Sequence, residues 1–176
     1  MADRALIING VPGSGKTTLS LALGDELNLP VLSKDAIKES LADATPVALP
    51  TRQLGRIAAE TLWSLIRLID GGVIVESFWF SGRDDAHFRR GIAAAGVRDG
   101  LELWCEASPE TTRTRFLTRP RHHAHSDAER IGEWESFSER AEPISDFPLM
   151  RVDTETRVDV ATVAQRVREF LPASRL

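Results

Sequence analysis

The sequence predicts an α/β protein in which helices cover both faces of a parallel sheet. Short apolar runs alternate with longer segments of helical periodicity along the whole chain, and strands separated by helices form parallel sheets. A glycine-rich loop lies between the first apolar run and the first helical segment. The 176 residues and the hydrophobic fraction of 42% suit one globular domain over residues 1–176.

Five segments are predicted to be strands because each is a short apolar or alternating run bounded by turn residues. The first and third are continuously apolar, as expected for strands that a parallel sheet buries on both faces. The fourth alternates between apolar and polar residues. In chain order the expected strands are 5–9, 30–32, 73–75, 101–106 and 149–152.

Helices are expected between these strands, where apolar residues recur three and four positions apart. Ser33 and Ser108 are suitable N-caps and Pro109 fits a first turn, whereas Gly71 and Pro120 end helices. The expected helices span residues 16–27, 34–42, 53–70, 85–95, 109–119, 128–141 and 158–171.

The composition excludes several classes of protein. No apolar run approaches the roughly 20 residues of a membrane span, and the first residues lack the pattern of a signal peptide, so no membrane partner is expected. The single cysteine, Cys105, excludes an internal disulfide and a cysteine-based metal cluster, favours the cytoplasm and suits core packing. With 22 basic and 26 acidic residues, the formal charge of −4 makes a nucleic-acid partner unexpected.

The most specific motif is the loop Gly10-Val-Pro-Gly-Ser-Gly-Lys-Thr17, which fits the pattern G-x-x-x-x-G-K-[ST]. Its glycines allow backbone N–H groups to point at phosphate oxygens, and the next helix directs its positive N-terminus to the same place. Lys16 supplies a charge to the phosphates and Thr17 a hydroxyl to Mg²⁺. ATP and Mg²⁺ are therefore the expected cofactors, bound by Gly10, Pro12, Gly13, Ser14, Gly15, Lys16, Thr17 and Thr18.

Other classes of protein that contain a phosphate loop fit the sequence less well. The glycine spacing and the Lys-Thr pair exclude a dinucleotide-binding loop. The tetrapeptide Asn-Lys-x-Asp that a small GTPase uses to bind guanine is absent, and a transporter ATPase would be longer. The class that remains is a small kinase-like domain with an acceptor site and a lid.

Two carboxylates follow expected strands at the edge of the sheet where α/β proteins bind ligands. Asp35 follows the second strand, where it can orient an acceptor hydroxyl and accept its proton; the alternative is a structural role at the start of its helix. Glu76 follows the third strand as a candidate Mg²⁺ ligand, direct or through water. A contact with the acceptor and a solvated strand-end charge are the alternatives for Glu76.

An aromatic run follows Glu76 and indicates a second part of the acceptor site. Phe78 and Trp79 are candidate lining residues, and Arg83 can bind an anionic or polar group of the acceptor. Core packing explains the aromatic residues equally well.

These motifs together resemble the small P-loop kinases grouped as AAA-domain-like kinases, whose relatives include zeta toxins, chloramphenicol phosphotransferase, gluconate kinase and the kinase domain of polynucleotide kinases. The resemblance covers about residues 6–171. It implies a three-layer P-loop NTPase fold with strand order 2-3-1-4-5 and a small lid over about residues 119–128. It rests on residues 10–17, on Leu32-Ser-Lys-Asp35, on Arg115, Arg119, Arg121 and His122, and on Val152-Asp153-Thr154.

The resemblance also implies roles for individual residues. Arg119 and Arg121 are lid arginines, whose planar guanidinium groups can neutralise the transferring phosphate; Arg115 lies against the adenine ring, and Thr154 belongs to the nucleotide site. Asp35, Lys16, Arg119 and Arg121 are thus the expected catalytic residues. The family more often has aspartate at the position of Glu76, and a basic helix face is the alternative for the arginines.

Three histidines, His122, His123 and His125, fall in the expected lid. Without an acidic or cysteine partner at a fixed spacing they make a poor zinc site, so a lid element is expected here.

The sequence thus predicts an ATP-dependent phosphotransferase that moves the γ-phosphate to a hydroxyl of a small molecule. A sugar, a nucleoside and a hydroxylated antibiotic of the capuramycin or chloramphenicol type are the candidate acceptors. A polynucleotide end kinase and a nucleotide-binding toxin or switch module are the alternatives. The identity of the acceptor, the choice between ATP and GTP, and a homodimer stay open.

Overall fold

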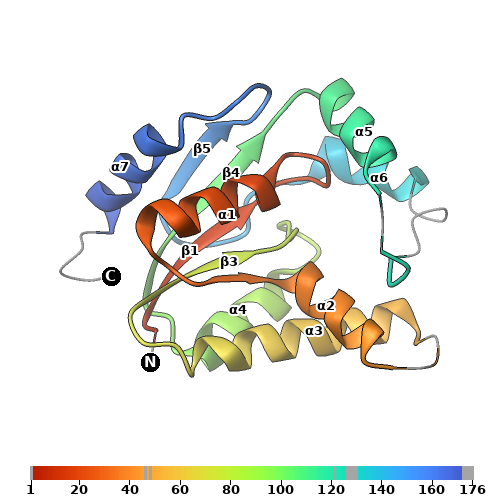
Figure 1. Ribbon diagram of the computed structural model, residues 1–176, viewed down its shortest axis with the longest axis horizontal. Helices are drawn as coiled ribbons and strands as arrows, with labels where there is room; N and C mark the ends of the chain where they lie inside the picture. Colours follow the sequence, from red (N-terminus) through yellow and green to blue (C-terminus); the bar gives the residue numbers. More distant parts are fainter. Residues whose placement is uncertain (1, 46, 48, 121, 126–130, 172–176) are drawn as a thin grey trace.

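The structure, a computed structural model, describes residues 2–45, 47, 49–120, 122–125 and 131–171. Its five strands form one parallel sheet in the order β2-β3-β1-β4-β5, which confirms the implied strand order (Figure 1). The strands are β1 (Arg4–Asn9), β2 (Val31–Ser33), β3 (Gly72–Glu76), β4 (Asp99–Glu106) and β5 (Leu149–Asp153).

Helices cover both faces of this sheet (Figure 1). Successive residues of β1 point to opposite faces: Leu6 and Ile8 pack with α1 and α7, and Ala5 and Ile7 pack on the face that α3 and α4 cover. The helices are α1 (Lys16–Leu27), α2 (Lys34–Asp43), α3 (Thr51–Ile66), α4 (Asp85–Ala95), α5 (Pro109–Thr118), α6 (Ile131–Arg140) and α7 (Val160–Phe170).

The helix ends show which local sequence signals were sufficient to predict where a helix begins or ends. Both expected N-caps are confirmed. The hydroxyl of Ser33 accepts a hydrogen bond from the amide of Ala36 at 3.4 Å, and the hydroxyl of Ser108 accepts one from the amide of Thr111 at 3.2 Å. The expected helix over 53–70 begins earlier, at 51, and ends at 66, where two turn hydrogen bonds replace the last helical turn. The expected helix over 128–141 spans 131–140, and residues 128–130 lie outside the described residues.

All five strands run in the same direction, so the loops that follow β1, β2, β3 and β4 gather at one edge of the sheet (Figure 1). The amino-terminal ends of α1, α2 and α5 lie at this edge, and α6 lies beside α5 (Figure 1). Ligands of parallel α/β sheets bind at such an edge. Within the described part of the chain, no helix combines the length and the apolar character that crossing a bilayer requires.

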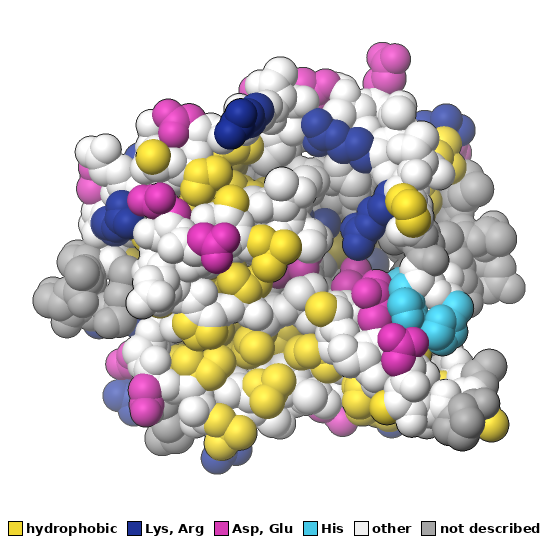
Figure 2. Space-filling view, in the orientation of Figure 1, with side chains coloured by type: hydrophobic (Ala, Val, Ile, Leu, Met, Phe, Trp, Pro, Cys, Tyr) yellow, Lys and Arg dark blue, Asp and Glu magenta, His cyan; other side chains and the backbone are white. Residues whose placement is uncertain are grey.

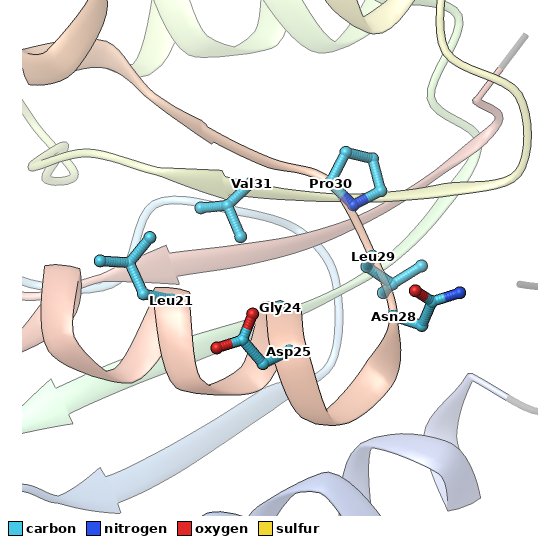
Figure 3. A pocket seen from close by; sticks show the side chains of 7 residues that line it. All are labelled: Leu21, Gly24, Asp25, Asn28, Leu29, Pro30 and Val31. Atoms are coloured by element: carbon cyan, nitrogen blue, oxygen red, sulfur yellow. The ribbon is translucent and has the colours of Figure 1, made fainter.

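A surface hollow of about 570 Å³ lies at the carboxyl-terminal end of α1 (Figure 3). It therefore lies at the opposite end of α1 from the glycine-rich loop and is not the nucleotide site. Its lining residues are Leu21, Gly24, Asp25, Asn28, Leu29, Pro30 and Val31.

Candidate nucleotide and acceptor site

The glycine-rich loop has a backbone that only glycine adopts without strain at its critical positions. Gly10, Gly13 and Gly15 have φ angles of 141°, 90° and 85°, in the region that side chains disfavour. A Cβ at Gly13 would lie 2.2 Å from the carbonyl oxygen of Thr112 in α5. The loop is therefore packed directly on the backbone of a neighbouring helix, which fixes its curvature for phosphate binding.

Lys16 lies in the first turn of α1 and reaches back over the loop. Its Nζ donates a hydrogen bond to the carbonyl of Val11 at 3.0 Å, and its residue is only 8% exposed. Burial lowers the pKa of Lys16, and the carboxylate of Glu76 counteracts part of this shift. A bound phosphate would offer this partly desolvated ammonium a stronger partner than a neutral carbonyl.

The nucleotide side of the site joins the loop to the end of β5. The hydroxyl of Thr154 donates to the carbonyl of Ser14 at 2.7 Å, and Arg115 donates to the carbonyls of Thr154 and Glu155, each at 2.9 Å. Arg115 and Thr154 therefore lie next to the loop, where the resemblance placed them. Thr18 is exposed in the first turn of α1.

Trp134 is a contact of the loop that the sequence did not indicate. Its Nε1 donates to the carbonyl of Pro12 at 3.2 Å, and its ring stacks on Phe116 of α5 with centroids 6.1 Å apart. The indole is almost fully buried. An aromatic residue in a polar helix has no sequence signature that distinguishes this contact from ordinary packing.

Asp35 lies in the first turn of α2, directly after Ser33 and Lys34, at the edge of the sheet that holds the loop. Burial alone would raise the pKa of Asp35, but the charges of Lys34, His125 and Lys16 lower it, and the net shift is downward. Its carboxyl group is therefore ionised at neutral pH, as a proton acceptor must be.

Glu76 ends β3 and is 3% exposed, so its interpretation as a solvated strand-end charge is wrong. Burial raises its pKa, and Lys16 and a hydrogen bond from Ser33 reverse only part of that shift. Among the described residues, its Oε2 has no hydrogen-bond partner. A buried carboxylate oxygen without a partner is costly, and a hydrated divalent cation would satisfy it. The buried carboxylate of Glu76 therefore fits a ligand of Mg²⁺.

The lid residues are described in part. Arg119 follows α5 and is exposed, yet its positive charge affects the pKa of both Lys16 and Glu76, so it lies near the phosphate side of the site. Arg121 lies outside the described residues. Arg113 is exposed on α5, as a surface residue should be.

The aromatic run after β3 divides between the site and the core. Trp79 is 2% exposed and packs against Trp63 and Phe88, so its prediction as an acceptor-lining residue is wrong. Phe78 is half-buried and lies with its ring centroid 5.9 Å from Nζ of Lys16. Alternation after a strand places neighbouring side chains on opposite sides, which explains this division.

Arg83 covers the aromatic side chains that remain near the site. Its guanidinium carbon lies 4.8 Å from the ring centroid of Phe78 and 4.2 Å from that of Phe80, and it forms an ion pair with Asp84. Cation–π contacts and the ion pair together fix the side chain of Arg83 beside Phe78.

A buried polar network that the sequence did not reveal connects the two sides of the site. Oδ1 of Asn9 accepts hydrogen bonds from the backbone amides of Gly10 at 2.8 Å and Trp79 at 3.1 Å. Nδ2 of Asn9 donates a hydrogen bond to the carboxylate of Glu102 at 2.8 Å. Glu102 also accepts the amide of Ser145 at 2.8 Å. Both polar side chains are fully buried. One asparagine thus aligns the start of the phosphate loop with the acceptor-side loop.

The described part of the expected lid contacts α2. His122 pairs with Asp43 at 3.0 Å, and His125 pairs with Glu39 at 2.9 Å. Figure 2 shows histidine side chains against acidic side chains at one edge of the molecule. The acidic partners that the sequence spacing lacked thus come from a helix about 80 residues earlier in the chain.

Comparison with known proteins agrees with this geometry. A family model described as "AAA domain" matches residues 6–144. Adenylate kinase 2 from Synechocystis sp. is 46% identical over 48 residues, which are 27% of this chain and 26% of that enzyme. The match with this curated relative thus spans only about a quarter of its length.

Solved structures match over nearly the whole chain. A provisionally described kinase from Chloroflexus aurantiacus J-10-fl is 30% identical, with a TM-score of 0.80, over 95% of this chain and 98% of that one. A sugar kinase from Janibacter sp. HTCC2649 (20% identical, TM-score 0.62) and the APS kinase of Mycobacterium tuberculosis in complex with AMPPNP and APS (16% identical, TM-score 0.63) each match over 98% of both chains. At these lower identities the likeness concerns the fold.

Proposed function

The chain belongs to the AAA domain family whose model matches residues 6–144, and from this premise we propose that it is an ATP-dependent phosphotransferase acting on a hydroxyl group of a small molecule. The observation that carries the proposal is the position of Asp35. Its ionised carboxylate and the ammonium of Lys16 lie within each other's electrostatic field at one edge of the sheet. This proximity supports a role for Lys16 as the phosphate-binding cation and for Asp35 as the proton acceptor of the same transfer.

The reaction divides between these groups. The amides of the loop and Lys16 bind the phosphates, and Asp35 orients the acceptor hydroxyl and accepts its proton as the oxygen–phosphorus bond forms. The bond between the γ-phosphorus and the bridging oxygen breaks, and ADP leaves. Arg119 compensates negative charge on the moving phosphoryl group. When bound by Thr17 and Glu76, Mg²⁺ would neutralise the phosphate oxygens.

The side chains beside Lys16 suit a small polar acceptor with a hydrophobic part. The half-buried ring of Phe78 offers an apolar surface near Lys16, and Arg83 beside it offers hydrogen-bond donors. Sugars, nucleosides and hydroxylated antibiotics of the capuramycin or chloramphenicol type all combine such surfaces. A sugar kinase among the similar structures supports including sugars among the candidates.

A screen of acceptors tests the proposal. Purified protein with Mg²⁺ and ATP is mixed with members of each acceptor class, and ADP release is followed together with the mass of the acceptor. Acceptor-dependent ADP release with a phosphorylated product is expected. Phosphorylation of oligonucleotide ends with no reaction of small molecules would favour an end kinase. Nucleotide binding with no transfer to any acceptor would favour a switch module.

A further inference from the structure

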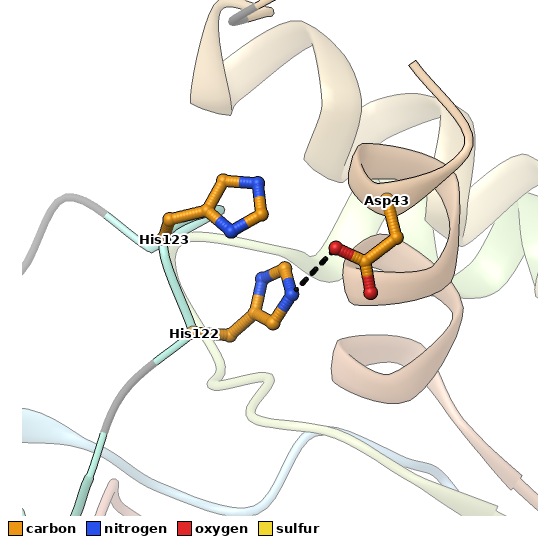
Figure 4. A group of neighbouring side chains, drawn as sticks. All are labelled: Asp43, His122 and His123. Carbon is orange, nitrogen blue, oxygen red and sulfur yellow. Dashed lines mark hydrogen bonds and ion pairs between the residues drawn. The ribbon is translucent and has the colours of Figure 1, made fainter. Parts of the chain in front are cut away.

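A group of three potential metal ligands lies where the lid segment meets the end of α2. Asp43 is the last residue of α2, and His122 and His123 follow α5. One ligand atom from each of the three lies within 4.8 Å of the other two, and Nε2 of His122 is 3.0 Å from Oδ1 of Asp43. Figure 4 shows both imidazole rings beside the Asp43 carboxylate.

Contacts outside this group hold the lid segment in place. The hydroxyl of Thr51 donates to the carbonyl of Ala124 at 2.8 Å, and the side chain of Ala124 is buried against Leu54. One helical turn before Asp43 in α2, Glu39 pairs with His125 at 2.9 Å, and the side chain of His125 is 5% exposed. The histidines are thus positioned next to Asp43 by three interactions in which the group itself takes no part.

The chemistry of the three side chains selects one class of ion. Two imidazole nitrogens and one carboxylate oxygen form a donor set typical of Zn²⁺ and similar divalent transition metals, whereas Mg²⁺ and Ca²⁺ prefer oxygen ligands alone. Three protein ligands leave one position of a tetrahedral ion for water. We propose that Asp43, His122 and His123 form a binding site for Zn²⁺ or another divalent transition metal, separate from the Mg²⁺–nucleotide site.

The geometry requires only local adjustment. Bonds of about 2.0–2.1 Å to a tetrahedral Zn²⁺ place neighbouring ligand atoms a little over 3 Å apart, close to the present distance between His122 and Asp43. Asp43 and His123 are exposed, so their side chains can rotate inward. One cost is the 3.2 Å hydrogen bond from the amide of Ala124 to Nδ1 of His122, because an imidazole that binds metal through Nε2 carries its proton on Nδ1.

The position of the site gives it a structural consequence. A bound ion would join the segment after α5 to the end of α2 by coordinate bonds, in addition to the hydrogen bond between His122 and Asp43. Asp35 lies at the other end of α2, and Arg119 precedes the histidines in the chain. The ion would therefore link the helix that carries the proposed proton acceptor to the segment that carries the lid arginine.

Zn²⁺ binding to the metal-free chain of 176 residues tests the site without a need for an acceptor. A titration in competition with a chromophoric chelator is expected to give one ion per chain, and Co²⁺ is expected to give the visible absorption of a tetrahedral site. His123→Gln and Asp43→Asn should each lower Zn²⁺ affinity by about 10- to 100-fold or more. The melting temperature without metal shows that each variant is folded.

One histidine variant outside the group is the matched control. His87→Gln removes the histidine of α4 and should keep wild-type Zn²⁺ affinity. Absence of stoichiometric Zn²⁺ binding overturns the proposal. Unchanged affinity in folded His123→Gln and Asp43→Asn overturns it as well, as does an equal loss of affinity in His87→Gln.

Discussion

The nucleotide side and the proposed acceptor side of this site are built in different ways. The nucleotide side consists mainly of eight consecutive residues, Gly10 to Thr17, whose backbone angles and packing on α5 fix the phosphate-binding loop. The proposed acceptor side combines side chains from separate elements, with Asp35 on α2 and with Phe78 and Arg83 after β3. Phosphate binding is thus a property of local backbone geometry, whereas the choice and activation of an acceptor depend on long-range folding.

This difference predicts two types of variant. A change on the acceptor side should impair transfer while ATP still binds, because the loop does not depend on those side chains. A change in the loop should impair ATP binding and transfer together. A change in the Asn9–Glu102 network, which connects the two sides, should impair ATP binding and transfer through its effect on both loops.

The largest effect is expected for Asp35→Asn. Asparagine keeps the size and most hydrogen bonds of aspartate but cannot accept the proton of an acceptor hydroxyl, so phosphoryl transfer should fall by roughly 10²- to 10⁴-fold. ATP affinity should stay close to that of the wild type. Transfer rate, ATP affinity and melting temperature are measured on the same preparation.

Asp25→Asn is the matched control for this prediction, since Asp25 is exposed on α1 beside the hollow of Figure 3. Its transfer rate should equal that of the wild type. Asparagine is about as good as aspartate near a helix start. A folded Asp35→Asn protein with normal transfer would therefore assign Asp35 to helix stabilisation alone and weaken the kinase proposal.

Lys16→Ala should reduce transfer on the order of 10²-fold or more, the loss expected for a charge that stabilises the transferring phosphate. Unlike the change at Asp35, it should also weaken ATP binding. The fold should persist, because Nζ contributes one hydrogen bond, to Val11. Arg113→Ala, which removes an exposed cation of α5, is the control. Wild-type transfer in a folded Lys16→Ala protein would contradict the assignment of the loop.

The nucleotide side could be predicted from the sequence because its signals are local. The motif of the loop is contiguous, and the caps Ser33 and Ser108 lie within three residues of the amides that they accept. The positions of Arg115 and Thr154 followed from the resemblance, since each lies at a fixed place relative to a strand or helix. Local periodicity and a family pattern therefore sufficed for the fold and the phosphate loop.

The acceptor side could not be predicted to the same extent, because its contacts join residues far apart in the chain. Asn9 and Glu102 are 93 residues apart, and neither stands out among polar residues near strands. Phe78 and Trp79 are adjacent aromatic residues, and only the packing of α3 and α4 decides that Trp79 belongs to the core. Asp43 pairs with a histidine 79 residues away, so no spacing could indicate that partner.

The network between the two sides gives a smaller effect, measured as stability. In Glu102→Gln, an amide NH₂ replaces a carboxylate oxygen that accepts backbone amides from Ile144 and Ser145. A donor facing a donor leaves buried groups unsatisfied at a cost of about 1–3 kcal/mol each. The melting temperature should therefore fall by several degrees.

Transfer and ATP affinity should both decrease in Glu102→Gln, since Asn9 aligns loops on both sides. Glu106→Gln, at the end of the same strand and less buried, serves as the control and should change neither. An unchanged melting temperature in Glu102→Gln would show that the network does not constrain the site.

The smallest effect, and the one that separates function from stability most sharply, is expected for Glu76→Gln. The folded-state pKa of Glu76 is raised above its ordinary value of 4.5, chiefly by burial. The folded state therefore gains stability from protonated Glu76 below about pH 4.5, and this contribution is lost as the pH rises through the folded-state pKa. Glutamine is neutral throughout, so the variant should melt higher than the wild type at pH 7, by about 2–4 °C for each kcal/mol gained.

Two further measurements on Glu76→Gln decide between the roles of this carboxylate. The difference in melting temperature should disappear near pH 4, where the wild-type carboxyl group is protonated as well. Saturating Mg²⁺ and ATP should stabilise the wild type more than the variant, because a Mg²⁺ ligand contributes only to the bound state. Glu60→Gln, an exposed change on α3, should show neither behaviour. If Glu76→Gln instead melts lower at pH 7 and gains as much from Mg²⁺ and ATP as the wild type, Glu76 is a structural partner of Lys16, and its assignment to Mg²⁺ is wrong.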